Sequence, residues 1–268
     1  MPGYPFADHS LAQRLEGCEA RANVAFVESR ARLAPHAGAT WIECAGALAM
    51  FDGIGSPLTQ TFALGVFAAP SPSDLERIET FFAERGAAVF HEVSPFAGVE
   101  TMELLVARGY RPVELSSVMY QPIAALPAPS DGRVRARIAT PDEIEHWSEI
   151  AAAGWSEFDD VAPLIRDLGR VAASAEGSTP FFAELEGVPI ATGTLATHGG
   201  VALLAGASTI PEGRRQGAQR ALLDARLRHA LSRGCDLAMM CAAPGSASQR
   251  NAERQGFRVA YTRTKWGR

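Results

Sequence analysis

The sequence predicts an α/β protein built from two similar halves, each a mostly antiparallel mixed sheet flanked by helices. Strand-type and helix-type periodicities alternate along both halves. Between them, residues 122–133 are rich in proline and show no amphipathic period, which predicts a linker. From Gly86 to Gly109 is 23 residues, and from Gly234 to Gly256 is 22, so an internal duplication is expected. We therefore expect domains over residues 1–121 and 134–268.

Composition and charge exclude several classes of protein. Hydrophobic residues make up 47% of the chain and charged residues 21%, which favours a folded globular protein over a disordered one. The formal net charge of −5 argues against nonspecific binding to nucleic acid. The beginning of the chain does not resemble a signal peptide, and the apolar run Ala45–Phe51 is too short to cross a membrane. A cytoplasmic protein without a membrane anchor is expected.

The four cysteines show no CxxC spacing, and Cys18, Cys235 and Cys241 stand in apolar-periodic segments. They are expected to be buried, reduced thiols. HExxH and GxSxG motifs are absent, so neither a zinc hydrolase nor a serine hydrolase is indicated. No metal cofactor is expected.

The elements of the N-terminal half follow from its apolar positions. A first helix is predicted from the stripe Leu11, Leu15, Cys18, Ala22 and Phe26. Strands are predicted over Trp41–Phe51 and Thr61–Phe67, joined through Gly53–Pro57. A second helix is predicted from Leu75, Ile78 and Phe82, ending at Arg85-Gly86.

The C-terminal half is predicted to begin with one strand and two helices, over Val134–Ile138, Pro141–Ala152 and Val161–Ala173. A meander of three strands follows, over Phe181–Glu186, Ile190–Thr197 and Val201–Thr209. The next helix is predicted from the stripe Leu223, Leu227, Ala230 and Leu231, and Gly234 ends it. The half closes with a strand, a helix and a strand, over Leu237–Ala242, Ala247–Gln255 and Arg258–Trp266.

The segment Ser208–Leu223, STIPEGRRQGAQRALL, is the strongest candidate for a ligand site. A strand runs into a short turn with Gly217, and a helix follows at once. A helix start offers unpaired N–H groups and a positive dipole end, which favour a phosphate. Arg214, Arg215 and Arg220 add positive charge in an acidic protein. The N-terminal half lacks this loop, because Pro211 to Gly234 is 23 residues whereas Pro70 to Gly86 is 16.

These residues resemble the pyrophosphate motif R/Q-x-x-G-x-G/A of the Gcn5-related N-acetyltransferase (GNAT) superfamily. Arg214 and Gly217 match the motif, and Gln219 departs from it. The resemblance implies two tandem acyl-CoA N-acyltransferase-like domains, of which the N-terminal one is a degenerate copy, and acetyl-CoA as cosubstrate. The residues it implies for coenzyme binding are Ser208, Thr209, Ile210, Arg214, Arg215, Gln216, Gly217, Ala218, Gln219, Arg220, Ser246 and Ser248.

The same resemblance implies that an acceptor amine attacks the thioester directly in a ternary complex, with backbone N–H groups near Thr209 or Ile210 as donors to the oxyanion. The acid position, often Tyr in the family, is Ala252 here, and Ser246 is the candidate near the sulfur, although it also suits a helix N-cap. Candidate bases are Glu157, Asp159, Asp160, Glu184 and His198, the last also suiting a turn. We take Glu157, Asp160 and Ser246 forward as catalytic candidates, while Tyr261 could face the core or the cleft.

The implied activity is transfer of an acetyl or other acyl group from acetyl-CoA to a primary amine. Gln219 and Ala252 keep a second hypothesis open, a noncatalytic acyl-CoA binding or regulatory module. Neither the acceptor nor the oligomeric state follows from the sequence, and a homodimer is compatible with it.

Overall fold

The computed structural model describes residues 3–123, 132–158 and 160–268. The chain divides into two compact units, one formed by residues 122–238 and the other by residues 3–121 together with 239–268. Both are mixed α/β structures in which helices flank a sheet. The segment 239–268, expected with the C-terminal domain, is thus grouped with the N-terminal half. Most of the expected linker lies outside the described residues.

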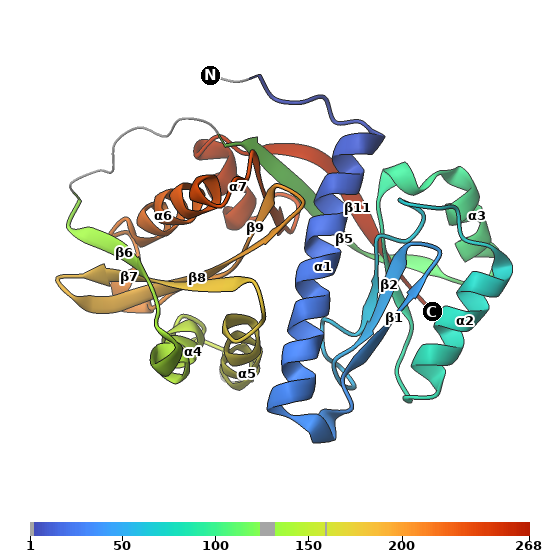
Figure 1. Cartoon of the computed structure of the whole chain (residues 1–268), viewed down its shortest axis with the longest axis horizontal. Coiled ribbons are helices and arrows are strands. Elements are labelled where there is room, and N and C mark those ends of the chain that lie inside the picture. Colours follow the sequence, from blue (N-terminus) through green and yellow to red (C-terminus); the bar gives the residue numbers. More distant parts are fainter. Residues whose placement is uncertain (1–2, 124–131, 159) are drawn as a thin grey trace. The chain divides into compact units, whose positions relative to one another are not determined.

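The unit of residues 122–238 is an antiparallel sheet with helices on both faces. Its elements are β6 (Val134–Ile138), α4 (Ile144–Ala153), α5 (Ala162–Ala173), β7 (Ser178–Leu185), β8 (Val188–His198), β9 (Val201–Thr209) and α6 (Ala218–Ser232). The strands pair in the order β6-β7-β8-β9, which confirms the predicted meander. Helix α6 covers one face and α4 and α5 the other (Figure 1). The predicted helix Pro141–Ala152 begins instead as a 3-10 turn, Pro141–Glu143, before α4.

A buried tryptophan of α4 attaches this helix to the sheet. Trp147 is 1% exposed, and its indole N–H donates to the carbonyl of Phe181 on β7 at 2.9 Å. Phe182 is also fully buried in this cluster. A buried indole needs a partner for its N–H, so this bond fixes α4 against the sheet.

The other unit holds the N-terminal half and the end of the chain. Its elements are α1 (His9–Leu33), β1 (Thr40–Cys44), β2 (Ala47–Phe51), β3 (Gln60–Phe62), α2 (Pro72–Ala83), β4 (Phe90–Val93), α3 (Val99–Ala107), β5 (Arg111–Pro122), β10 (Leu237–Ala242, from residue 239), α7 (Ala247–Arg254) and β11 (Arg258–Gly267). The strand order is β1-β2-β3-β4-β11-β5-β10. Strand β11 pairs antiparallel with both β4 and β5, so the last strand of the chain is inserted into the sheet of the N-terminal half.

The predicted strand Trp41–Phe51 is a hairpin. Ala45 and Gly46 both have positive φ, 49° and 74°, and form the two-residue turn between β1 and β2. Apolar residues continue through this turn, so hydrophobicity alone could not locate it. Strand β3 is also shorter than the predicted Thr61–Phe67, because Ala63 turns the chain with φ 60°.

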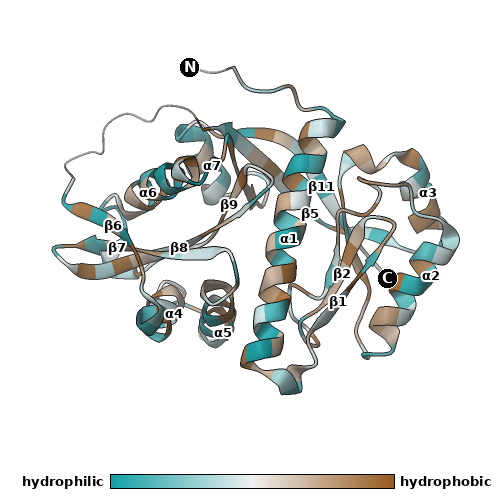
Figure 2. Cartoon of the chain, in the orientation of Figure 1, coloured by the Kyte–Doolittle hydropathy of each residue, from teal (hydrophilic) through white to brown (hydrophobic). Residues whose placement is uncertain are grey.

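Strand β2 is buried along its whole length, and Figure 2 shows it as hydrophobic. Ala47, Ala49 and Phe51 belong to the cluster that packs on α2, whereas α1 also contacts β1 and β2. A strand buried at every position has both faces covered, as a continuous apolar run predicts.

The two halves repeat an order of elements. Three strands, a helix, a strand, a helix and a strand occur as β1-β2-β3-α2-β4-α3-β5 and again as β7-β8-β9-α6-β10-α7-β11. Common descent of the halves stays a prediction.

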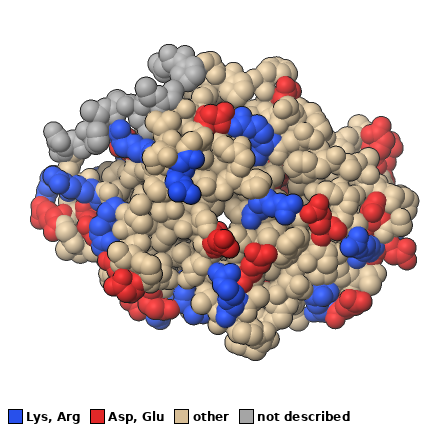
Figure 3. Space-filling model, in the orientation of Figure 1, with Lys and Arg blue, Asp and Glu red and all other residues tan. Residues whose placement is uncertain are grey.

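The helices and the charge of the surface bear on two kinds of partner, a membrane and a nucleic acid. Among helices of the described chain, none combines the length and apolar character that crossing a bilayer requires. On the face in Figure 3, basic and acidic side chains are interspersed. This face therefore lacks the single-sign field that nonspecific nucleic-acid binding uses.

Candidate functional site

The loop between β9 and α6 has an unusual backbone. After a 3-10 turn over Pro211–Gly213, Arg215 has φ 64° and Gly217 has φ 90°, both in the left-handed region. A Cβ at Gly217 would meet no atom within 4 Å. Glycine is therefore required there for its conformation rather than for packing, and the space beside it is free for a ligand.

The start of α6 presents a row of unused donors. The N–H groups of Arg220 and Ala221 donate to the carbonyl of Gly217 at 3.1 and 3.0 Å. Within the described part of the chain, nothing accepts a hydrogen bond from the N–H groups of residues 215–219. Left-handed residues next to a helix start form a concave set of donors, and the helix dipole adds positive potential. The backbone therefore fits a phosphate group.

The corresponding helix of the N-terminal half is closed to an anion. Helix α2 begins with a capping box, in which the Ser71 hydroxyl accepts from the N–H of Asp74 at 3.2 Å and the Asp74 carboxylate accepts from the N–H of Ser71 at 2.8 Å. Its own side chains satisfy these donors, and the carboxylate would repel a phosphate.

Of the three arginines in the loop, one pairs with a carboxylate of the described chain and two do not. Arg214 Nη1 lies 2.7 Å from Glu157 Oε2, and its Nη2 donates to the carbonyl of Gly154 at 3.3 Å. Arg214 thus ties the loop to the segment between α4 and α5. Arg215 and Arg220 are exposed and have no carboxylate partner among the residues that the structure describes.

The base of the loop is packed tightly on β8. Gly213 is buried, and a Cβ there would lie 2.7 Å from Ile190 Cβ. The N–H of Ile210 donates to the carbonyl of Ile190 at 3.0 Å, so it is not free to bind an oxyanion as the sequence suggested. Hydrogen bonding alternates along an antiparallel pair, so the N–H of Thr209 faces away from β8. Thr209 is therefore the remaining candidate of the two.

The end of β9 is locked to the end of α4. Ser208 is buried, and its hydroxyl donates to the carbonyl of Ala151 at 2.8 Å. A Cβ at Gly154 would lie 1.9 Å from Ser208 Oγ and 3.0 Å from the backbone N and O of Thr209. Only glycine permits this approach.

Gln219, the departure from the motif, reaches back to the end of β9. Its Nε2 donates to Thr209 Oγ1 at 2.8 Å and lies 3.5 Å from the carbonyl oxygen of Ser208. A glycine or alanine at this position would leave the end of β9 uncovered. Gln216 is exposed beside it and Ala218 is buried.

The candidate bases occupy different places. Glu157 lies beside the loop through Arg214, and Asp160 is exposed in the same segment, whereas Asp159 lies outside the described residues. Glu184 is paired with Arg137 at 2.8 Å on β7. His198 lies at the turn before β9, roughly 26 Å from Thr209 along the strand at about 3.3 Å per residue. It is the last residue of β8 and is paired with Val201, so the turn itself is formed by Gly199 and Gly200 rather than by His198.

The serines proposed from the closing helix belong to the other compact unit. Ser246 caps α7, because its hydroxyl accepts from the N–H of Gln249 at 3.2 Å, as an N-cap serine does. Ser248 is exposed on the same helix. Ala252 is buried at 5% exposure. The structure thus gives Ser246 a capping role, and its catalytic role stays a prediction.

A buried charged cluster was not anticipated from the sequence; we call it the Arg263 cluster. It comprises Glu16, Glu19, Glu92, Tyr261 and Arg263. Arg263 lies 3.3 Å from Glu16 and 3.1 Å from Glu92, and its Nη2 donates to Glu19 at 2.8 Å. The Tyr261 hydroxyl donates to Glu16 at 2.8 Å, so Tyr261 faces the core. Burial, opposed by the Arg263 charge, raises the pKa of Glu16 to about 7. The cluster could have been anticipated from Glu16 and Glu19, which stand among the apolar residues of α1.

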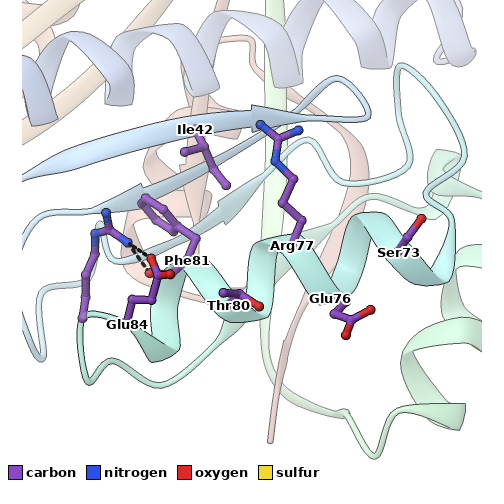
Figure 4. Close-up of a pocket in the computed structure, with 8 residues that line it drawn as sticks. Ile42, Ser73, Glu76, Arg77, Thr80, Phe81 and Glu84 are labelled. Atoms are coloured by element: carbon purple, nitrogen blue, oxygen red, sulfur yellow. Dashed lines mark hydrogen bonds and ion pairs between the residues drawn. The ribbon is translucent and has the colours of Figure 1, made fainter.

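Two hollows lie away from the loop. One, of about 530 Å³, is lined by side chains of α2, by Glu84 and Arg85 after it and by Ile42 of β1. Its charges are mixed: Glu84 pairs with Arg85 at 3.6 Å, whereas Arg77 and Glu76 point in different directions from α2 (Figure 4). The other, of about 460 Å³, lies between β6, β7 and the end of α5 and is lined mainly by apolar side chains. Neither includes a residue of the loop, and neither brings together groups that suit acyl transfer.

Comparison with known proteins agrees with this geometry. Residues 143–257 match the model of the Acetyltransferase (GNAT) family, so the C-terminal half of the chain carries a domain of that family. The match spans α4 to α7 and includes the whole loop. None of the curated proteins matches the sequence.

Solved structures share the fold over nearly the whole chain. A GCN5-related N-acetyltransferase from Kribbella flavida is 20% identical with a TM-score of 0.63, over 92% of this chain and 94% of that one. A tandem GNAT protein from the clavulanic acid biosynthesis pathway is 13% identical with a TM-score of 0.56, over 83% and 78%. A GNAT-family acetyltransferase structure from Novosphingobium aromaticivorans is 15% identical with a TM-score of 0.53, over 89% and 95%. At these identities the likeness shows the fold.

Proposed function

We propose that this protein is an N-acetyltransferase that binds acetyl-CoA at the loop of residues 214–220 and transfers the acetyl group to a primary amine. The observation that carries the proposal is the row of N–H groups at residues 215–219 without acceptors, framed by left-handed Arg215 and Gly217. These donors suit the coenzyme's phosphates, and exposed Arg215 and Arg220 add charge. Membership of residues 143–257 in the GNAT family supports the reaction class.

In the proposed reaction the amine nitrogen attacks the thioester carbon directly. The new N–C bond forms, the C–S bond breaks, and coenzyme A leaves as a thiolate while the amine gives up a proton. The N–H of Thr209 is the proposed donor to the oxygen on which negative charge develops. The acidic segment that contains Glu157 and Asp160 is proposed to attract the cationic amine and to accept its proton.

Arg214 would couple coenzyme binding to this segment. Its guanidinium is paired with Glu157 at 2.7 Å. Phosphate oxygens would compete for the same guanidinium, because arginine forms strong charge-assisted bonds with phosphate. Bound coenzyme would thereby free the Glu157 carboxylate for the acceptor. Roles for Ser246 and Ser248 stay sequence-based predictions.

The proposal gives one coenzyme site per chain. The capping box of Ser71 and Asp74 closes the helix start that corresponds to the loop in the N-terminal half. The tandem arrangement, with domains over residues 1–121 and 134–268 and a degenerate first copy, is part of the proposal. The four cysteines are free in the structure, and the cytoplasm is the proposed location.

Calorimetric titration tests coenzyme binding first, and thiol release then tests acyl transfer. Acetyl-CoA at about 100 times its Kd stabilises the folded state by about 2.7 kcal/mol, so the melting temperature should rise by roughly 5–10 °C with one molecule bound per chain. Thiol release with a panel of primary amines then measures turnover. Absence of binding would refute the proposal, and binding without turnover on any amine would favour a regulatory acyl-CoA binding module.

A further inference from the structure

The buried stripe of α6 contains an arginine and differs from the predicted stripe of Leu223, Leu227, Ala230 and Leu231, of which Leu231 is 42% exposed. Leu222, Arg226 and Ala230 follow one another at intervals of four and are all buried, Arg226 at 4% exposure. No carboxylate among the described residues pairs with it. Burial lowers the pKa of Arg226 to about 10, so it still carries its charge at neutral pH.

The guanidinium is held by carbonyl groups at one place in the sheet. Its Nε donates to Leu222 O at 3.2 Å, and its Nη1 donates to Thr194 O at 3.2 Å and Ala205 O at 3.4 Å. Thr194 and Ala205 are register partners across β8 and β9. A Cβ at Gly193 would lie 3.0 Å from Nη1, so the glycine leaves room for the guanidinium.

Strand β9 bulges at this point. Register passes from the pair Thr192–Ser208 to the pair Thr194–Ala205, so Gly206 and Ala207 face Gly193 alone. Gly206 has φ 60°, as the bulge requires. Residues 205–207 are exposed, whereas the rest of β9 up to residue 208 is buried. The bulge therefore presents backbone on the strand that leads into the phosphate loop, with the Arg226 cation attached beneath it.

An uncompensated buried charge is costly, and a neutral amide could donate to the same carbonyl groups at lower cost. The presence of a charged side chain at this buried position points to a use for the charge itself. We infer that Arg226 is a positioning residue for acyl transfer: it fixes the β9 bulge through Thr194 and Ala205, and it places a positive charge beneath the strand whose end carries Thr209, the proposed donor to the thioester oxygen. This inference rests on the proposed function, and it concerns turnover rather than coenzyme affinity.

The test compares Arg226→Met, Arg226→Gln and Arg226→Lys with wild type, using Arg228→Met, a more exposed position on the same helix, as the matched control. Coenzyme A affinity is measured by calorimetry, kcat and KM by thiol release with the best amine of the panel, and the flexibility of residues 204–208 by hydrogen exchange. We expect Arg226→Met and Arg226→Gln to lower kcat roughly 30-fold, with coenzyme Kd within about 3-fold of wild type. Arg226→Lys, which keeps the charge, should recover most of kcat, and exchange at residues 204–208 should rise in Arg226→Met.

Three results overturn the inference: an unchanged kcat in Arg226→Met, an unchanged exchange rate at the bulge, or an Arg226→Gln variant as active as Arg226→Lys. Loss of coenzyme affinity in proportion to kcat would likewise show a merely structural role. Failure of the proposed function is separate, since wild type itself would then either bind no coenzyme A or bind it without turning over any amine.

Discussion

Replacing Gly217 with aspartate should abolish tight coenzyme binding while leaving the protein folded. Gly217 has φ 90°, and a Cβ there would meet no atom within 4 Å, so the new side chain fits but its backbone is strained. That strain costs about 1 kcal/mol, because asparagine and aspartate tolerate left-handed conformations better than other residues do. The free energy of unfolding should fall by that amount, equally in Gly217→Asn and Gly217→Asp.

The charge separates the two variants. A carboxylate about 5 Å from a phosphate charge, at an effective dielectric constant of about 20, is repelled by about 3 kcal/mol. That energy corresponds to roughly 100-fold in Kd. We therefore expect the coenzyme A Kd of Gly217→Asp to exceed that of Gly217→Asn by about 100-fold at low salt, and by less at 0.5 M salt because ions screen the repulsion.

Isothermal titration calorimetry of both variants, with urea unfolding as the check on folding, measures the two quantities. Equal affinity of the aspartate and asparagine variants, both folded, would refute the assignment of a phosphate to this loop. A loss of binding that salt does not change would refute the electrostatic reasoning.

Three other predictions follow from contacts around the loop and in the core. Gly154→Ala should lower the free energy of unfolding by roughly 2–4 kcal/mol, because its Cβ would lie 1.9 Å from Ser208 Oγ. Adding Ser208→Ala to the same chain should restore part of the lost stability, as measured by urea unfolding. A double variant no more stable than Gly154→Ala would contradict the clash. Glu157→Gln releases Arg214 from an exposed ion pair, so the free energy of unfolding should change by less than about 1 kcal/mol. Calorimetry should show tighter coenzyme binding, and thiol release should show a lower kcat. An unchanged kcat would exclude Glu157 as the base. Glu16 binds its proton more tightly in the folded chain, where its pKa is about 7, than at its ordinary pKa of 4.5. Its contribution to the free energy of unfolding should therefore fall by roughly 2–3 kcal/mol as pH rises from 5 to 8. Urea titrations should show this loss in wild type and not in Glu16→Gln, and parallel pH profiles of the two proteins would contradict the prediction.

The sequence alone located most helices and strands, because apolar periodicity reports which face of an element is buried. The bounds of the meander β7-β8-β9 were predicted to within three residues, and the helix after it was also predicted. The phosphate loop was also readable, since glycine, arginine and a helix start lie within one short segment. Element positions and the loop depend on residues that are close together in the sequence, so the sequence is enough to predict them.

Tertiary structure decided what depends on long-range pairing. A continuous apolar run could be one strand or two, and only the left-handed turn at Ala45 and Gly46 made it a hairpin. Periodicity gives no strand order, so the insertion of β11 between β4 and β5 was not foreseen. Which charged residues are buried was equally hidden: Arg226 occupies the inner stripe of α6 because Gly193 leaves it room and because backbone carbonyls of two strands accept its hydrogen bonds. Those acceptors are contributed by distant segments, and a charge can be buried only where the folded chain brings its partners together.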